Sequence, residues 1–304
     1  MKTILGFNGE NIGELYILYH LLRSIENSKD WVILTKRPRL IKNFLDANKI
    51  KIKINSIFSL DFLKVRKILI SGGGIFDKEI GGFWKLGLLL LLFLLKFKKI
   101  EIMWKDVSIY RDFPSFWLNI LTRLFKKSNV IQLRDDTNKS ILEFLRKKDI
   151  KYFVKKDLTC KQPIRKGFKK CKYILINFKS SKVKKKQFDT LISFLKTISK
   201  KYEICYIPFH YSDIKLCKKF GGPIFLTYHL KKFENLIKKS MLVISMRYHP
   251  LVFAKQFGVP SVGIYSHEKI KNFCKKYKIP MLINIDDNAK KLLKNFIDGY
   301  ERKK

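Results

Sequence analysis

The sequence predicts an α/β protein made of two domains with parallel sheets. Short apolar segments with β-branched residues, such as Met241 to Ile244, are typical of strands buried on both faces of a sheet. They alternate with helical patterns, which favours right-handed βαβ units. The periodicity lapses over residues 158–170, a polar stretch with Pro163 and Gly167. We therefore expect a linker there, between a first domain at 1–157 and a second at 171–304.

The first domain begins the alternation. Its expected strands are short apolar runs between turn residues: Thr3–Phe7, Trp31–Thr35, Ile50–Ile54, Lys67–Ser71, Ile100–Trp104, Val130–Leu133 and Tyr152–Asp157. Its expected helices follow the helical period: Glu14–Ile25, Leu40–Asn48, Phe83–Leu95, Phe113–Phe125 and Asn138–Lys147, the last capped by Asp136. The leucine run at 86–95 is too short to span a bilayer, so we expect a fully buried helix.

The second domain repeats the pattern. Its expected strands are Tyr173–Phe178, Tyr202–Phe209, Ile224–Thr227, Met241–Ile244 and Ser261–Ser266. Its expected helices are Gln187–Lys200, Lys231–Lys239, Leu251–Phe257 and, with Ser266 as cap, His267–Tyr277.

Two residues follow the strand at 241–244. Arg247 and His249 lie in a tight turn between this strand and the next helix, where free backbone N–H groups and the helix dipole attract anions. Lys269 lies in the first turn of the following helix, so the three cationic or protonatable groups are expected around one crevice. A capping or packed imidazole is the alternative interpretation of His249.

Other polar residues follow strands in the same way. His210 and Asp213 come after the strand at 202–209, on the rim that carries His249, although Asp213 also suits a helix N-cap or first turn. Arg134 ends the strand at 130–133, on the usual ligand side of an open sheet. The alternative for Arg134 is a structural salt bridge to Asp135 or Asp157.

Two glycine-containing loops are further candidates. Gly72, Gly73 and Gly74 follow a strand, where backbone amides can approach a ligand closely; a tight strand-to-helix crossing without ligand is the alternative. The loop at 8–13, ahead of the first helix, resembles a phosphate cradle. It lacks both the G-x-G-x-x-G pattern and a Walker lysine, so it is a weak nucleotide signal.

Composition limits the class of protein. The net charge of +40 favours anionic partners, namely nucleic acid, acidic lipid or phosphorylated and carboxylated metabolites, although a solvated lysine-rich surface is the simpler explanation for most of it. The five cysteines form no C-x-x-C pair, and Met1 to Phe7 is too short an apolar run for a signal peptide. We expect a cytosolic protein with reduced thiols. No H-x-x-x-H motif or carboxylate cluster suggests a metal.

Several motifs, taken together, resemble the polysaccharide pyruvyltransferase family. They occur in the family's order: a glycine and N-x-G loop at Gly6 to Glu14, G-G-G at Gly72 to Asp77, and R-D at Arg134. A P-F motif one residue tighter than usual runs from Pro208 to Asp213, and S-M-R-x-H followed by G-V-P-x-V-G-I runs from Ser245 to Ile264. The last of these is the most specific. The resemblance covers nearly the whole chain.

The resemblance implies a GT-B-like fold of two Rossmann-type domains facing a cleft, and an activity. Members transfer the enolpyruvyl group of phosphoenolpyruvate to a sugar as a pyruvate ketal, usually on a cell-surface polysaccharide, and release phosphate. His249 would be the general acid/base, Arg134 and Lys269 would hold the donor, and Arg247 would assist them. Acceptor or loop contacts would come from Asn11, Gly13, Glu14, Gly72, Gly73, Gly74, His210 and Asp213. No cofactor is implied beyond the donor substrate.

Alternatives follow from the same residues. The family's D-E pair after N-x-G is Glu14-Leu15 here, and the loop before it is shortened, which leaves room for an inactive relative that serves as a scaffold. A glycosyltransferase that uses a nucleotide sugar would occupy the same two-domain fold. A nucleic-acid-binding protein would use the +40 charge, but the lysines are not striped with aromatic residues. The basic surface would also favour contact with anionic membrane and a lipid-linked acceptor.

Overall fold

The chain forms two compact units. The computed structural model describes residues 1–7, 9–59, 64–76, 82–110, 113–134, 137–155, 173–179, 185–220, 224, 228–284 and 286–301. Unit 1 comprises Met1–Glu10 and Glu14–Lys161, and unit 2 comprises Asn11–Gly13 and Gln162–Lys304. The expected linker at 158–170 lies outside the described residues. The sequence did not predict that Asn11–Gly13 would group with the second unit.

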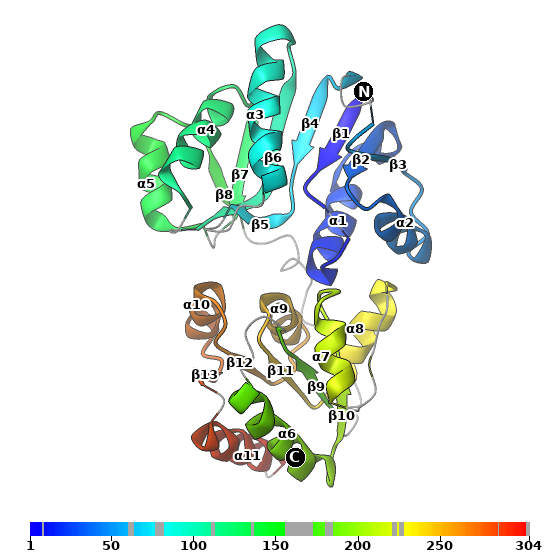
Figure 1. Ribbon diagram of the computed structural model, residues 1–304, viewed down its shortest axis with the longest axis vertical. Coiled ribbons are helices and arrows are strands. Elements are labelled where there is room, and N and C mark those ends of the chain that lie inside the picture. The colour runs from blue at the N-terminus through cyan, green and yellow to red at the C-terminus, as the bar shows by residue number, and fades with distance from the viewer. Residues whose placement is uncertain are drawn as a thin grey trace. The chain divides into compact units, whose positions relative to one another are not determined.

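Unit 1 is built on one parallel sheet (Figure 1). Its described strands are β1 Lys2–Leu5, β2 Trp31–Thr35, β3 Lys53–Ser56, β4 Lys67–Ile70, β5 Gly73–Phe76, β6 Glu101–Ile109, β7 Val130–Arg134 and β8 Phe153–Lys155. They run in the order β3-β2-β1-β4-β6-β7-β8, and β5 pairs with β6. From β1 the strands are added toward one edge of the sheet as β2 and β3, and from β4 they are added toward the other edge. The position between β1 and β4 is therefore the topological switch point of a doubly wound fold.

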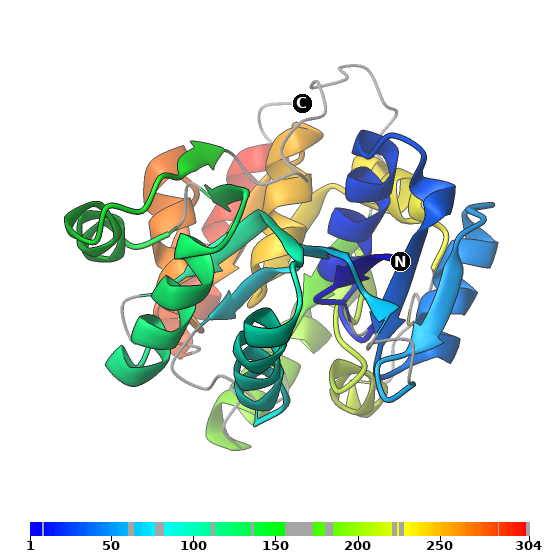
Figure 2. The same ribbon diagram turned by 90° about the horizontal axis from the view of Figure 1, so that it is seen from above.

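Helices cover both faces of this sheet. They are α1 Ile12–Ser24, α2 Pro38–Ala47, α3 Gly82–Phe97, α4 Ser115–Lys126 and α5 Lys139–Lys147, with a 3₁₀ turn at Ser28–Asp30. Figure 2 shows α3 and α4 side by side on one face of the sheet and α1 on the opposite face. The side chain of Asn138, rather than the expected Asp136, caps α5 by accepting the N–H of Ser140; Asp136 lies outside the described residues.

Helix α3 differs from its prediction as a fully buried helix. Leu88, Leu91 and Leu94 are buried, but five large apolar side chains on the opposite side are exposed: Leu86, Leu89, Leu90, Phe93 and Phe97. A helix that is apolar all round can bury only the side that meets the sheet unless a further layer covers it. The prediction failed because composition alone does not show whether a second layer exists.

Unit 2 has its own parallel sheet. Its described strands are β9 Tyr173–Asn177, β10 Glu203–Tyr206, β11 Leu242–Ser245, β12 Ser261–Ile264 and β13 Met281–Leu282, in the order β10-β9-β11-β12-β13. The switch point lies between β9 and β11. The helices are α6 Lys185–Ser199, α7 Asp213–Lys219, α8 Leu230–Lys239, α9 Tyr248–Gln256, α10 Glu268–Tyr277 and α11 Asp287–Glu301.

The predicted fold class is confirmed. Every strand pair in both sheets is parallel, and strands alternate with helices through most of the chain, as in Rossmann-like domains. Each unit has its own apolar core. Of the strand expected at 224–227, only Ile224 is described, and it makes a single bridge to Tyr206. In the described parts of the chain, no helix combines the length and apolarity needed to cross a bilayer.

Candidate functional site

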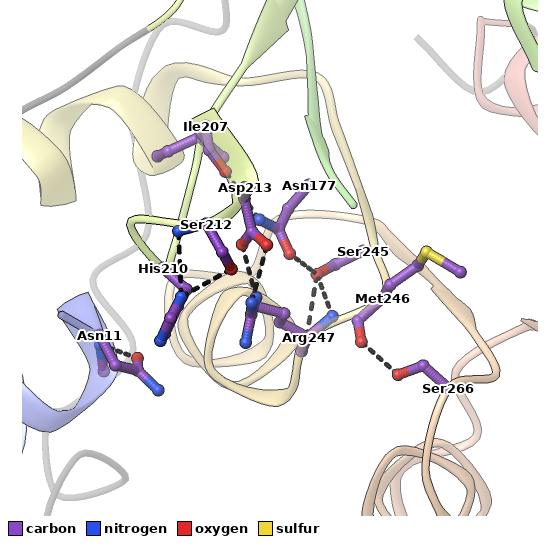
Figure 3. Close-up of polar contacts among 11 residues, drawn as sticks. Asn11, Asn177, Ile207, His210, Ser212, Asp213, Ser245, Met246, Arg247 and Ser266 are labelled. Carbon is purple, nitrogen blue, oxygen red and sulfur yellow. Dashed lines mark hydrogen bonds and ion pairs between the residues drawn. The ribbon is translucent and has the colours of Figure 1, made fainter. Parts of the chain in front are cut away.

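A polar network occupies the switch point of the unit 2 sheet. Asn177 ends β9 and Ser245 ends β11, and both are fully buried. The Asn177 Nδ2 donates to the Ile207 carbonyl at 2.8 Å, and its Oδ1 lies 3.2 Å from the Ser245 hydroxyl (Figure 3). The Ser245 Oγ in turn accepts the N–H of Arg247 at 2.9 Å. These bonds hold the turn after β11 against the neighbouring strand.

Arg247 is held by Asp213. Its Nε donates to Asp213 Oδ2 at 2.6 Å and its Nη2 donates to Asp213 Oδ1 at 2.7 Å, so the ion pair is bidentate (Figure 3). Asp213 is the first residue of α7 and is fully buried, whereas 17% of the Arg247 side chain is exposed. The expectation of a first-turn acid therefore describes Asp213 well. A carboxylate with no exposed surface cannot touch an acceptor in this arrangement.

His249 lies inside a helix rather than ahead of one. Helix α9 begins at Tyr248, three residues earlier than predicted, which puts His249 in its first turn. The predicted start at Leu251 took Pro250 as the marker of a helix beginning, because proline is favoured at the start of a helix. Proline is also tolerated at the third position, whose N–H has no partner within a helix, so α9 can start at Tyr248. The imidazole thus lies at the positive end of the helix dipole.

Lys269 and His249 both contact the ring of Tyr248, a residue that the sequence did not single out. The Lys269 Nζ lies 4.0 Å from the centre of the Tyr248 ring, a cation–π distance, and the Tyr248 ring meets the His249 ring edge-on with centres 5.4 Å apart. Tyr248 therefore contacts both the ammonium and the imidazole. The signal available in the sequence was only its position beside His249.

The cap of α10 also differs from its prediction. His267 is the N-cap, and its Nδ1 accepts the N–H of Lys269 at 3.1 Å. The predicted cap, Ser266, instead donates its hydroxyl to the Met246 carbonyl. This bond ties the start of α10 to the turn that carries Arg247, so Lys269 is positioned relative to the same turn.

The segment Asn11–Gly13 completes the surroundings of His249. Asn11 forms an antiparallel bridge with His210, and the Ile12 N–H donates to the Phe209 carbonyl at 2.9 Å. The Asn11 Oδ1 accepts the Gly13 N–H at 2.8 Å, a local cap for the start of α1. A Cβ at Gly13 would overlap the His249 ring. Glycine is therefore required for this approach, and the imidazole packs against backbone.

Arg134 belongs to unit 1 and is buried with an acid that the sequence analysis did not name. Its side chain is 1% exposed, and its Nη1 lies 3.8 Å from the Oδ2 of the fully buried Asp106. Asp106 has a φ of +57° at an irregularity of β6, a conformation that aspartate tolerates better than most residues. The structural salt bridge left open for Arg134 therefore exists, but with Asp106. Asp135 and Asp157 lie outside the described residues.

The glycines of unit 1 serve strand packing. Gly73 begins β5 and pairs with Val107 of β6, while Gly72 has a φ of +135° between β4 and β5. Gly6, after β1, has a φ of +115°, and a Cβ there would overlap the carbonyl oxygen of Ser71. Glycine thus lets the ends of β1 and β4 approach each other. Gly74 follows within β5, and Glu14 lies half-buried in the first turn of α1.

The structure therefore groups the predicted residues in two sets. Unit 2 contains His249, Arg247, Asp213, Lys269, His210, Asn11 and Gly13. Unit 1 contains Arg134, Glu14, Gly72, Gly73 and Gly74. Within the described residues, no three histidine, cysteine or acidic side chains are arranged to hold a metal ion.

Comparison with known proteins decides the family. The family model described as polysaccharide pyruvyl transferase matches residues 11–268, a span that contains the S-M-R-x-H motif and every predicted residue of the unit 2 set except Lys269. The chain belongs to the polysaccharide pyruvyl transferase family. Members of this family are transferases. No curated protein matches the sequence significantly.

Solved structures show the same fold at low sequence identity. A Staphylococcus aureus MnaA structure with UDP has a TM-score of 0.63 at 15% identity, covering 98% of this chain and 88% of that one. UDP-GlcNAc 2-epimerase from Neisseria meningitidis, bound to UDP-GlcNAc, has a TM-score of 0.63 at 11% identity, with 99% and 93% covered. The wall teichoic acid polymerase TagF has a TM-score of 0.52 at 12% identity, with 99% and 80% covered. This pyruvyl transferase family member therefore has a GT-B-type fold.

Proposed function

We propose that this protein transfers the enolpyruvyl group of phosphoenolpyruvate to two hydroxyls of a sugar, forming a pyruvate ketal and releasing phosphate. The observation that carries the proposal is the setting of His249. It lies in the first turn of α9, against the backbone of Gly13, beside the Tyr248 ring that Lys269 also contacts. A protonatable ring next to a cation and a positive helix end suits a small, highly anionic donor.

The proposed chemistry needs proton transfer and charge neutralisation. The two sugar hydroxyls bond to C2 of the donor, the bond from C2 to the phosphate oxygen breaks, and the methylene carbon gains a proton to become a methyl group. Of the two hydroxyl protons, one goes to this carbon and the other leaves with phosphate. A histidine can accept and return a proton near neutral pH, so we assign His249 as the general acid/base.

Charge on the donor is assigned to cations and backbone dipoles. Lys269, with the N–H groups of the first turn of α9, is proposed to bind the carboxylate or phosphate. Arg134 is proposed, by the family resemblance, as a further donor contact from unit 1. For Arg247 the bidentate bond to Asp213 favours a positioning role, since its Nε and Nη2 both donate to the carboxylate. The same bonds and the burial of Asp213 favour a role in positioning this turn over a contact with the acceptor.

The acceptor is proposed to be a sugar of a cell-surface polysaccharide or glycolipid, met on the cytoplasmic side of the membrane. Asn11 and His210 are the acceptor candidates that unit 2 brings together, because they pair through a backbone bridge. The chain's charge of +40 supports an anionic setting such as acidic lipid.

The test measures phosphate release from phosphoenolpyruvate in the presence of candidate glycans. We expect His249→Gln to lower the rate at least a hundredfold, the range typical for loss of a general acid/base. His229→Gln is the matched control, because His229 is exposed at the start of α8, outside the site. The proposal fails if no glycan supports phosphate release, or if His249→Gln reacts as fast as the control. Protection from thermal unfolding by a nucleotide sugar, but not by phosphoenolpyruvate, would instead favour a glycosyltransferase.

A further inference from the structure

The outward side of α3 is an apolar stripe. Leu86, Leu89, Leu90, Phe93 and Phe97 are 65%, 45%, 39%, 55% and 70% exposed, and their spacing of three and four residues places them along one side of the helix. Large apolar side chains occur singly on most surfaces, but a contiguous run of this kind marks a surface that binds another apolar surface. We call these five residues the α3 stripe.

Lysines border the α3 stripe. From residue 82 to residue 100 the sequence has four lysines and no acidic residue: Lys85, Lys96, Lys98 and Lys99. The last three are exposed at the end of α3, and Lys85 lies at the other end, with its Nζ 5.7 Å from the centre of the Trp117 ring on α4. The exposed Phe116 packs edge-on against Trp117, so apolar surface continues beside the start of α3. An apolar stripe edged by cations matches an anionic, apolar partner.

An apolar pocket opens beside the same helix. Its volume is about 140 Å³, comparable to engineered apolar cavities of about 150 Å³ that bind benzene. Leu86 and Leu90 of the stripe line it, and it reaches the ends of β1 and β2 at Phe7 and Thr35. The exposed Lys36 also lines it. The pocket therefore joins the stripe to the switch point of the unit 1 sheet, and its lining suits a hydrocarbon chain with an anionic group at its end.

We propose that the α3 stripe docks on an anionic lipid bilayer and that a lipid chain enters the adjoining pocket. Helix α3 has 16 residues and is therefore ~24 Å long, shorter than the hydrocarbon core of a bilayer. It lies in the plane of the interface, with the stripe among the acyl chains and the lysines at the headgroups. This inference concerns where the protein works, and it holds for any reaction at His249.

Charge favours the bilayer over a second copy of the chain. Two copies that met through their α3 stripes would bring the same lysines together, and each chain carries a net charge of +40. Such like-charged surfaces repel each other. An anionic membrane satisfies both the apolar stripe and its basic border.

The first experiment measures co-sedimentation of the full chain with vesicles. We expect binding to vesicles of phosphatidylcholine with 30% phosphatidylglycerol, and at least tenfold weaker binding to phosphatidylcholine alone. The variant Leu89→Gln/Phe93→Gln removes exposed apolar groups and is expected to weaken binding at least tenfold. Ile283→Gln is the apolar control, because Ile283 is an exposed apolar residue of unit 2, and it is expected to bind like the wild type.

Further variants separate the basic border and the pocket. Lys96→Gln/Lys98→Gln/Lys99→Gln is expected to abolish the preference for anionic vesicles. A triple variant of three exposed lysines on α8 is expected to keep that preference despite the same change of charge: Lys231→Gln/Lys232→Gln/Lys239→Gln. Gly87 lines the pocket, and a Cβ there meets no atom within 4 Å, so Gly87→Leu is expected to weaken binding severalfold by filling part of the pocket.

Three results would overturn the proposal. One is a wild-type protein that does not bind the anionic vesicles, and another is a folded Leu89→Gln/Phe93→Gln variant that binds them as well as wild type. The third is a wild-type dimer, measured by light scattering, that the same variant dissociates, because a second copy would then cover the stripe. A folded Gly87→Leu variant with wild-type binding would overturn the pocket assignment. Circular dichroism establishes that each variant is folded.

Discussion

The two sheets have equivalent switch points with opposite chemistry. In unit 2 the ends of β9 and β11 carry Asn177 and Ser245, which connect to Arg247 through buried hydrogen bonds. In unit 1 the ends of β1 and β4 carry Gly6 and Ser71, and the adjoining pocket is lined largely by apolar side chains. The same topology thus carries a polar network in unit 2 and an apolar pocket in unit 1. The side chains at the strand ends, rather than the fold, decide what each edge can bind.

Glycine accounts for much of this difference. At Gly6 the backbone has a positive φ and approaches Ser71 so closely that no side chain fits, so position 6 carries no functional group. In unit 2 glycine instead comes from Gly13, outside the sheet, and it makes room for the His249 ring. One unit uses glycine to bring strands together, and the other uses it to make room for the imidazole of His249.

The largest effect is expected when the polar switch point is broken at Asp213. Asp213→Asn keeps the shape but removes the charge opposite the partly buried Arg247, so we expect a loss of about 3 kcal/mol in the free energy of unfolding. Urea denaturation measures it. Asp46→Asn is the control, because Asp46 pairs with Lys42 on the surface of α2 and the loss of this exposed pair should cost less than about 1 kcal/mol. Equal losses in the two variants would contradict a structural role for the Asp213 pair.

Gly13→Ala is expected to have the next largest effect. The added methyl group overlaps the His249 ring, so the ring must move, and phosphate release should fall at least tenfold while stability falls by about 1–3 kcal/mol. Gly263→Ala is a matched control, because its methyl group would crowd the buried Cys274 rather than a site residue. It should lose stability but retain the activity of the folded fraction. Similar activity losses in both would show that His249 does not depend on Gly13.

A pH effect is expected from the buried thiols of unit 2. Burial raises the pKa of Cys205 and of Cys217 to about 12, and that of Cys274 to about 11. Each folded thiol therefore stays protonated above pH 9, where an unfolded thiol ionises, so the stability these groups contribute is complete below about pH 9 and is lost as pH rises toward 12. Denaturation at pH 8 and pH 10 measures the loss.

Cysteine labelling tests the same burial directly. Iodoacetamide at pH 8 should leave the three peptides that carry Cys205, Cys217 and Cys274 unlabelled in the folded protein and should label them in urea, as read by mass spectrometry. Labelling of any of the three under folding conditions would contradict the burial described for that residue.

The smallest effect is expected at Gly87, on the apolar side of the comparison. Gly87→Ala replaces a helical glycine where the methyl group meets no atom within 4 Å, so α3 should gain up to about 1 kcal/mol in stability. The melting temperature measures this gain. Gly299→Ala in α11 is the matched control, since a methyl group there also meets no atom within 4 Å. A destabilised Gly87→Ala variant alone would indicate that the pocket cannot accommodate a methyl group.

The sequence predicted the fold class and most strands because parallel, buried strands leave a local apolar signature. The run at 241–244 and its partner at 261–266 correspond to β11 and β12, since each carries the signature without help from distant residues. Helix starts were predicted less well. Proline suits several positions in the first turn, so the start of α9 depended on the turn that Ser245 closes after β11.

The sequence predicted which site residues lie near one another only where they follow the ends of parallel strands, because these ends lie at one edge of the sheet. That reasoning brought Arg247, His249 and Lys269 to one rim, but it could not show that Asp213 holds Arg247 or that Tyr248 contacts both His249 and Lys269. Both depend on side-chain directions. The exposure of the α3 stripe could not be predicted either, because a leucine run has the same sequence pattern whether or not another layer covers the helix.

The contact between Gly13 and His249 has a consequence for synthesis. The two residues are separated by 236 positions, and at about 5–20 residues per second a ribosome needs roughly 12–47 seconds to make the chain between them. For most of that interval the amino-terminal residues are also without the Phe209 carbonyl, which later accepts the Ile12 N–H. A fragment that starts at residue 162 would never acquire them, so the carboxyl-terminal half made alone would lack the backbone against which the His249 ring packs.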